Sequence, residues 1–145
     1  MTSYSFNVDG IEPAPQGSKS YMGKSRFGKA LLIESCSRVK TWRGLVNKVA
    51  RTFIKTPIEG ACEVKLVFKL IRRKSDFNSK GEVKKNAPKH YLVKRNDLDK
   101  LVRSTLDALS GVAYLDDCQV IKVLASKRYA DYGDIGAEVF IQTID

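Results

Sequence analysis

The sequence has only three cysteines and a single histidine, and this scarcity excludes several kinds of site. Cys36, Cys62 and Cys118 are odd in number and form no C-x-x-C pair. Neither a disulfide framework nor a zinc knuckle is therefore expected, and buried free thiols are the default prediction. The one histidine, His90, cannot build a histidine-based nuclease or zinc site by itself, so we expect a loop residue without a chemical role.

Long apolar runs are also lacking. No stretch approaches the roughly 18 apolar residues that a membrane span needs, and the first residues have neither the basic start nor the apolar run of a signal peptide. We therefore expect a cytoplasmic protein. The 145 residues are 43% hydrophobic and 29% charged, which is typical of a folded chain with one hydrophobic core. We expect a single domain over residues 1–145, because no internal boundary would leave two viable cores.

Acidic residues are outnumbered, since 26 Lys and Arg stand against 16 Asp and Glu and give a net charge of +10. Between Ser18 and Arg95 there are 21 basic residues and only five acids. Such a distribution favours a polyanionic partner, because Lys and Arg at phosphates release condensed counterions. The alternative is a charge that serves only solubility. The candidate DNA-contacting residues are Lys19, Lys24, Arg26, Lys29, Arg72, Arg73, Lys74, Lys94, Arg95 and Lys100.

Alternation of apolar and polar residues predicts a small sheet. Residues 4–8, 62–70 and 137–142 each alternate with period two, which indicates strands with one buried face. Residues 120–125 are apolar apart from Lys122 and predict a fully buried strand.

Two segments have helical periodicity instead. Residues 39–53 predict a helix that Ser35 or Ser37 can cap, and residues 98–109 predict a second helix that ends near a glycine. Trp42 is predicted to anchor the core, with base stacking as the less favoured alternative. These elements predict an α+β fold, in which a small mixed β-sheet carries two principal helices.

Three irregular segments separate these elements. Residues 12–17, rich in proline, cannot form regular structure. Residues 18–29, rich in Gly, Ser and basic residues, suit a flexible loop along a phosphate backbone, although a plain solvated loop has the same composition. Residues 72–90 form a long polar stretch, and loops of this length are usually functional or disordered.

An acidic island follows the basic body, with five acids and two basic residues between Asp97 and Asp117. Asn96 or Asp97 is a good helix N-cap, and an acid in the first turn is favoured by the helix dipole, so capping alone can explain Asp97 and Asp99. However, Asp116 and Asp117 precede a strand that must return to the same core. Carboxylates from both places can converge on a hard cation such as Mg²⁺.

Arg103 and Asp107 follow Asp99 at steps of four residues, so all three share the polar face of the predicted helix. One interpretation is an ion-pair ladder on a solvated face, worth a few tenths of a kcal/mol. The other places Arg103 against the scissile phosphate, beside the metal. Because adjacent residues of a strand point to opposite faces, only one of Asp116 and Asp117 is expected to be a ligand.

Three motifs carry a resemblance to a known family: KRNDLDKL at 94–101, DALSGV at 107–112 and YLDDCQV at 114–120. In this order and spacing they resemble the RusA family of bacterial and phage Holliday-junction resolvases, whose pattern runs K-P-D-x-D-N-L-x-K, then D-A-L-x-G and D-D-x-Q-V. RKS at 73–75 and APKH at 87–90 are also similar to phage members. The resemblance is clear over residues 64–138 and looser before them.

The resemblance implies a homodimeric, Mg²⁺-dependent endonuclease of the bacterial host cytoplasm, in which Mn²⁺ can substitute. By position, its metal ligands are Asp97, Asp99 and Asp117, supported by Asp107 and Asp116. Two residues depart from the family pattern: Lys100 replaces an asparagine, and Arg103 replaces a lysine. Arg103 can hold a phosphate bidentately, but arginine does not readily give up a proton.

The expected function is therefore metal-dependent resolution of four-way DNA junctions in recombination and repair. Two alternatives stay open. In one, the chain is a non-catalytic nucleic-acid-binding protein whose aspartates only cap a helix and a turn. In the other, it is a nuclease of the same chemistry that acts on flaps or other branches. Convergence of Asp97, Asp99 and Asp117 around one cation would favour an enzyme over a binding protein.

Overall fold

The structure is a computed structural model that describes residues 1–17, 19–24, 30–34, 37–131 and 133–145, with the backbone alone described within 18–36. The strands are β1 (Ser3–Asp9), β2 (Lys19–Lys24), β3 (Ala30–Glu34), β4 (Cys62–Leu70), β5 (Val120–Tyr129) and β6 (Gly136–Thr143). The helices are α1 (Val39–Phe53) and α2 (Leu98–Leu109), with short 3₁₀ helices η1 (Lys74–Asp76) and η2 (Asp117–Gln119).

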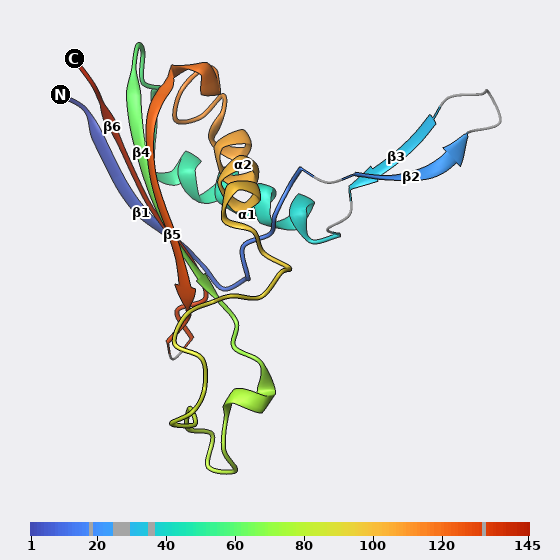
Figure 1. Cartoon of the computed structure of the whole chain (residues 1–145). Helices are drawn as coiled ribbons and strands as arrows, with labels where there is room; N and C mark the ends of the chain where they lie inside the picture. Colours follow the sequence, from blue (N-terminus) through green and yellow to red (C-terminus); the bar gives the residue numbers. More distant parts are fainter. Residues whose placement is uncertain (18, 25–29, 35–36, 132) are drawn as a thin grey trace.

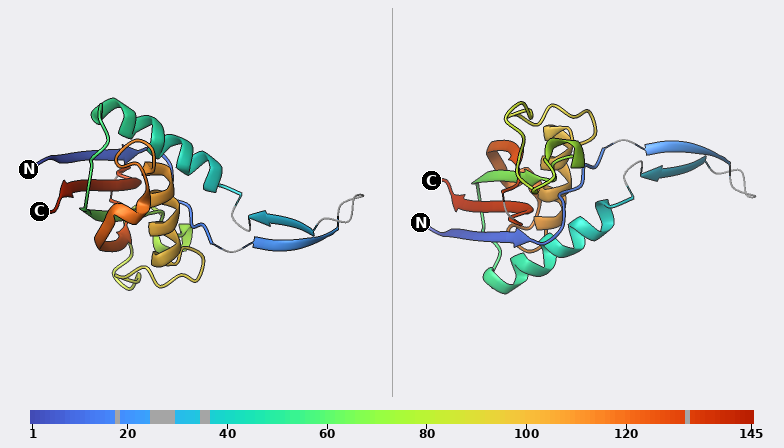
Figure 2. Two further views of the ribbon diagram at one scale, coloured as in Figure 1. Left: turned by 90° about the horizontal axis from the view of Figure 1, so that it is seen from above. Right: turned by 90° about the horizontal axis from the view of Figure 1, so that it is seen from below.

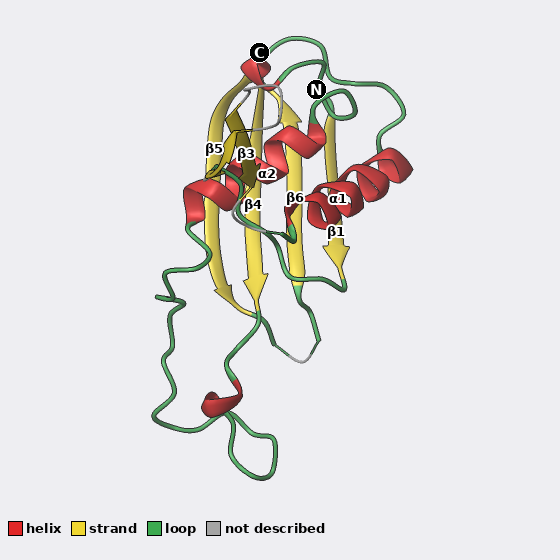
Figure 3. Ribbon diagram, turned by 90° about the vertical axis from the view of Figure 1, so that its right-hand side faces the viewer, coloured by secondary structure: helices red, strands yellow, loops and turns green. Residues whose placement is uncertain are grey.

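Four strands form a mixed sheet in the order β1-β6-β4-β5. β6 pairs antiparallel with β1 and β4, whereas β4 and β5 are parallel. α1 and α2 both cover one face of this sheet, as Figures 1 and 3 show. The predicted α+β architecture with two principal helices is therefore confirmed. Because parallel strands need a crossover, α2 runs back along the sheet, and its end lies beside the start of β5.

The core lies between the sheet and the two helices. Trp42 is fully buried, and its Nε1 donates a hydrogen bond to Thr105 Oγ1 at 3.1 Å, which joins α1 to α2. Trp42 is thus a core anchor, as predicted, and is not available for base stacking. The predicted serine cap of α1 is wrong for Ser37, because the helix begins after Arg38 without a side-chain cap. Ser35 lies outside the described residues.

The strand at residues 120–125 is not buried, contrary to the prediction. β5 is the edge strand of the sheet, and α2 covers only part of its length. Ile121 and Leu124 are 64% and 61% exposed. An apolar run predicts burial only if both neighbours and both faces are covered, and an edge strand lacks one neighbour.

Residues 18–29 were expected to be a loop, but part of this segment is a strand. β2 pairs antiparallel with β3, with Lys19 opposite Glu34 and Lys24 opposite Ala30. This two-stranded arm projects away from the body of the molecule in Figures 1 and 2. Lys19 and Lys24 belong to the arm, whereas Arg26 and Lys29 lie outside the described residues.

The long polar segment at 72–90 is a loop, as expected, and it extends from the end of the sheet opposite η2 (Figure 3). Its base is fixed by Arg72, which lies over the Tyr129 ring at 4.0 Å and donates to Pro88 O at 2.9 Å. Arg72 also pairs with the buried Asp76 at 3.3 Å. His90 is exposed within this loop, as predicted.

The cysteines divide between interior and surface. Cys62 is a buried free thiol, as predicted, but Cys118 is exposed, so the expectation of burial is wrong there. Cys36 lies outside the described residues. In the part of the chain that the structure describes, no helix has the length and apolar character to cross a membrane.

Candidate functional site

The start of α2 carries Asp97 and Asp99. Asp97 occupies the N-cap position, as predicted, but its side chain makes no capping hydrogen bond. It instead pairs with Lys100 at 3.7 Å. Asp99 is exposed in the first turn, where the helix dipole favours a negative charge. Capping alone therefore does not explain Asp97.

The Asp116-Asp117 pair lies in the turn before β5 rather than in the strand itself. Asp116 caps η2, since its side chain accepts a hydrogen bond from Cys118 N at 2.9 Å while Gln119 closes a capping box. The hydrogen bond from the Cys118 backbone, followed by those from the Cys118 and Asp117 side chains, lowers the pKa of the Asp116 carboxyl. Asp116 therefore has a structural role, and Asp117 is the member of the pair whose carboxylate is not used in the cap.

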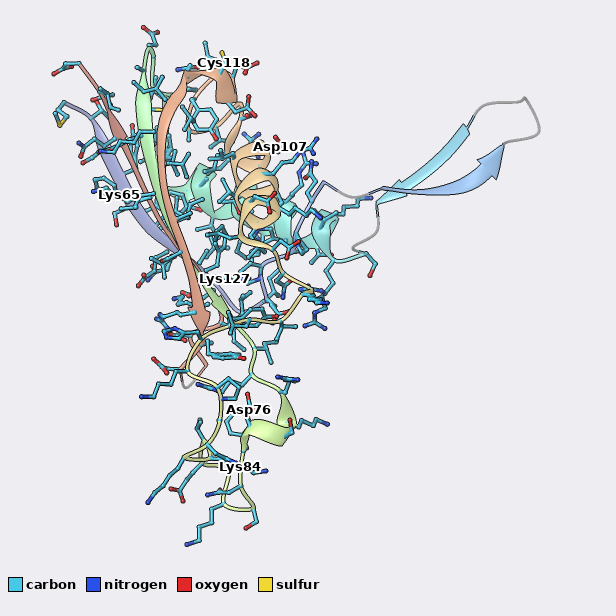
Figure 4. All side chains as sticks on the ribbon, in the orientation of Figure 1. Lys65, Asp76, Lys84, Asp107, Cys118 and Lys127 are labelled. Atoms are coloured by element: carbon cyan, nitrogen blue, oxygen red, sulfur yellow. The ribbon has the colours of Figure 1, made fainter. Side chains whose placement is uncertain are left out.

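Asp117 and Asp107 form an adjacent pair of carboxylates, which we call the Asp107–Asp117 pair. Partial desolvation and the neighbouring carboxylates of Asp116 and Asp107 raise the pKa of the Asp117 carboxyl. Residues 110–116 lead from the end of α2 into η2, which packs against α2 and so brings Asp117 to the Asp107 end of the helix. Figure 4 places Asp107 on the upper half of α2, toward the end where Cys118 lies.

The structure does not bring Asp97 and Asp99 to this pair. Asp99 and Asp107 are eight residues apart on α2, a rise of about 12 Å along the helix axis. Among the described residues, no group of three or more His, Cys, Asp or Glu side chains is positioned to hold a metal ion. The sequence-based triad of Asp97, Asp99 and Asp117 is thus divided between the two ends of one helix.

Gln16 lies at the Asp107 end of the site, although no motif in the sequence points to it. Its Nε2 donates to Asp107 Oδ2 at 2.6 Å, and its backbone N donates to Lys100 O at 3.0 Å. Ser104 Oγ also donates to Ala14 O at 2.6 Å, so the segment before Gly17 lies directly on α2. The only signal in the sequence is the irregular, proline-rich composition of residues 12–17.

Arg103 lies between the two ends of the site, on the face of α2 that carries Asp99 and Asp107. No ion pair joins it to either acid in the described part of the chain, so the ion-pair ladder is not observed. Its guanidinium lies against Gly17, where an added Cβ would be 3.3 Å from Nη1. Gly17 also has a φ of 145°, so a side chain there is disfavoured by both backbone and contact.

A buried carboxylate holds the segment that leads into α2. Glu12 accepts hydrogen bonds from Arg95 Nη2 at 3.1 Å and from Ile71 N at 2.8 Å, and it pairs with Arg38 at 3.4 Å. Because Arg95 directly precedes Asn96 and Asp97, Glu12 fixes the position of the first acid of the site. No role for Glu12 is predicted by the sequence, since a single acid before prolines has no specific signal.

The predicted DNA-contacting residues have different surroundings. Arg73, Lys74, Lys94 and Arg95 are exposed. Arg72, by contrast, is largely enclosed by Asp76, Pro88 and Tyr129, so its place is the base of the loop rather than a free surface. Lys100 is half-buried and paired with Asp97.

The fold and the site together define a small α+β domain with a basic surface and carboxylates gathered on one helix and the turn that follows it. The sequence matches the family described as endodeoxyribonuclease RusA over residues 11–142, nearly the whole chain. The chain therefore belongs to the RusA family of endodeoxyribonucleases, and the resemblance found in its motifs is confirmed. No curated protein matches the sequence.

Proposed function

We propose that this protein is a Mg²⁺-dependent endonuclease that resolves four-way DNA junctions in recombination and repair. The observation that carries the proposal is the adjacency of Asp107 and Asp117 in a chain of an endodeoxyribonuclease family. A carboxylate whose ionisation is made costlier by a neighbouring acid, as that of Asp117 is, is suited to share a cation with it. The basic residues of the surface are suited to the phosphates of a branched duplex.

The residues at the Asp107 end of the site fit a hard divalent cation. Mg²⁺ is commonly bound by one or two carboxylates, with water and substrate phosphate as the other ligands. Asp107 and Asp117 supply two carboxylates, and Gln16 holds the first of them by donating from Nε2 to Asp107 Oδ2 at 2.6 Å. The bound cation would activate water and stabilise negative charge on the phosphate; Mn²⁺ can substitute.

Asp97 and Asp99 are proposed to act at the other end of α2. A single ion cannot contact both ends within one chain, because the ends are about 12 Å apart. We propose that Asp97 and Asp99 form a second cation position that uses substrate phosphate as a further ligand. Arg103, between the two positions, would then hold the phosphate bidentately.

The role of Arg103 gives a direct prediction. Arg103→Ala is expected to lower the cleavage rate at least about tenfold while the dissociation constant for DNA changes much less, because the contact matters most as charge builds on the phosphate. Arg103→Lys is expected to retain activity. Single-turnover cleavage and binding would be measured for both variants, with Arg43→Ala, on the exposed face of α1, as the matched control. Unchanged turnover in Arg103→Ala would contradict the phosphate contact.

The basic surface gives a second prediction. We propose that the arm with Lys19 and Lys24 and the exposed residues Arg73, Lys74, Lys94 and Arg95 contact the phosphate backbone. If about six phosphates are neutralised, the slope of log K against log salt is expected to be near −5. Affinity for a junction would be measured by fluorescence anisotropy between 50 and 300 mM salt, on the order of the range where this effect is large. A slope near zero would exclude backbone contacts.

We also propose a homodimer, because a junction has two equivalent strands to cut and closed two-fold dimers are the commonest assemblies. We propose that the second copy binds along the exposed edge of β5. Ile121 and Leu124 are exposed there, and β5 has a strand neighbour on one side only within its sheet. Edge strands with apolar residues readily pair with another chain, and two copies of one edge can pair antiparallel about a two-fold axis.

The test of the proposed function is a cleavage assay on a synthetic four-way junction, with Mg²⁺ and with EDTA. Paired, metal-dependent nicks that yield two duplexes are expected. Tight binding without cleavage in any divalent metal would instead indicate the non-catalytic binding protein. Cleavage of flaps in preference to junctions would retain the chemistry and change the substrate.

A further inference from the structure

A cavity of about 490 Å³ lies at the end of the sheet where β1 and β4 end and β6 begins. Its apolar wall is formed by three residues that adjoin these strands, Ile11, Ile71 and Ile135, and Thr41 from the first turn of α1 also lines it. Its described lining contains none of the acids of α2 and η2. A volume of several hundred Å³ with apolar walls and few polar groups is typical of a ligand site.

Arg95 brings a guanidinium group to this cavity. Its side chain is 65% exposed, and its Nη2 donates to Glu12 Oε1 at 3.1 Å. Among the described residues, this guanidinium makes no other hydrogen bond. Glu12 is itself held in place, because its side chain is 6% exposed and accepts from Ile71 N at 2.8 Å. Since a guanidinium has five N–H donors in a rigid fork, Arg95 is fixed at one corner and can present the other donors to an anion.

The charges around the cavity favour an anionic ligand. Arg38 is the second guanidinium of the lining, and it pairs with Glu12 at 3.4 Å and donates to Asn96 Oδ1 at 3.4 Å. Two guanidinium groups therefore face one carboxylate, which leaves one positive charge in excess. The first turn of α1 adds no acid. A ligand that combines a negative charge with a flat apolar surface would match both the free donors of Arg95 and the isoleucine wall.

We propose that this cavity binds one unpaired nucleotide of a DNA strand, with its phosphate on Arg95 and its base against the isoleucine wall. This inference deepens the proposed function and rests on it only for the DNA substrate. Arg95 stands two residues before Asp97, so a strand held there continues toward the start of α2. A base stacked inside a duplex cannot enter a cavity, whereas a base at a branch point is released at lower cost. Isoleucine side chains form no hydrogen bonds with base edges, so the contact tolerates any base.

The experiment compares two single strands of equal length in EDTA, one of thymidylates and one of abasic sites, by fluorescence anisotropy. Because both strands carry the same phosphates, the ratio of their dissociation constants isolates the contribution of the base. The wild type is expected to bind the thymidylate strand about tenfold or more tightly than the abasic strand. Ile71→Asp and Thr41→Glu place a carboxylate in the lining and are expected to bring the ratio to about one, because a charged wall is a poor contact for a base. Val83→Asp, on the 72–90 loop, is the matched control and should keep the ratio, since Val83 and Ile71 are both 48% exposed.

Equal affinity of the wild type for both strands would mean that phosphates alone hold the DNA, and the nucleotide site would be overturned. A full ratio in either folded cavity variant, or loss of the ratio in Val83→Asp, would also overturn it. Circular dichroism and thermal unfolding check folding. Thr41→Glu keeps the test decisive if Ile71→Asp does not fold, because Thr41 is exposed and the helix dipole favours an acid in the first turn. Failure of the wild type to cleave junctions would remove the proposed function, whereas the ratio measured in EDTA would still test the nucleotide site.

Discussion

Asp117→Asn is expected to reduce junction cleavage by more than about a hundredfold, because Asp117 is proposed as a metal ligand and losing a ligand costs more than the 10- to 100-fold loss from an outer partner. Binding of the junction should persist or strengthen, since a negative charge beside the phosphates is removed. Asp97→Asn is expected to give the same separation of cleavage from binding. The measurements are single-turnover cleavage in Mg²⁺ and junction binding in EDTA.

A scan of asparagine variants would decide which acids hold the cation. Asp107→Asn and Asp117→Asn are expected to weaken Mn²⁺ binding in the absence of DNA, because they alter the Asp107–Asp117 pair. Asp97→Asn and Asp99→Asn should weaken it only when a junction supplies phosphate. Asp131→Asn, an exposed residue beyond β5, is the control. Retained cleavage in both Asp97→Asn and Asp117→Asn would exclude a metal site on this helix.

Replacement of Leu124 by aspartate, alone or with Ile121→Asp, is expected to convert the proposed dimer into a monomer. At a two-fold interface, the introduced carboxylate would be buried opposite the same carboxylate of the second copy. Its desolvation and the repulsion between the two charges cost more free energy than the leucine contact contributes to association. The monomer should nick one strand and release few resolved duplexes, because the two cuts are no longer coupled. Light scattering would give the mass, and product analysis on a junction would separate nicking from resolution.

Leu92→Asp is the matched control for the dimer, since Leu92 is 85% exposed and lies on the segment between the 72–90 loop and α2. It should remain a dimer and resolve junctions. A mixed dimer of wild-type and Asp97→Asn subunits should nick a single strand. A dimer that survives Leu124→Asp would place the interface elsewhere, and a wild-type monomer that still makes paired cuts would remove the dimer from the mechanism.

The elements of this fold follow from local patterns in the sequence. The alternation at 62–70 and the helical spacing at 39–53 and 98–109 predict β4, α1 and α2 at their observed bounds. Such patterns are reliable because the apolar positions of an element form the side that packs on the core. Trp42, which is fully buried, lies on that side of α1. Family membership also followed from the sequence, since its motifs are contiguous in the chain and need no fold to be recognised.

Which strands are neighbours, and which faces of each element are covered, was decided only by the tertiary structure. Apolar residues at 120–125 predict burial, but sheet order makes β5 an edge and leaves Leu124 exposed. The basic segment at 18–29 has the composition of a loop, yet part of it pairs with Ala30–Glu34 in an arm. Neither sheet order nor strand pairing is a property of one segment, because each depends on which other segments lie beside it.

In the candidate site, too, some features follow from the sequence and others only from the tertiary structure. The sequence by itself determined which acids the chain has and that Asp99, Arg103 and Asp107 share one helical face. Only the crossover between β4 and β5 decided that Asp107, rather than Asp97 or Asp99, meets Asp117. Gln16 reaches Asp107 from 91 residues away in the chain, and no local pattern carries a contact of that separation. The sequence therefore determines which acidic side chains are present. Which of them lie together depends on long-range packing, because packing fixes the distances between segments.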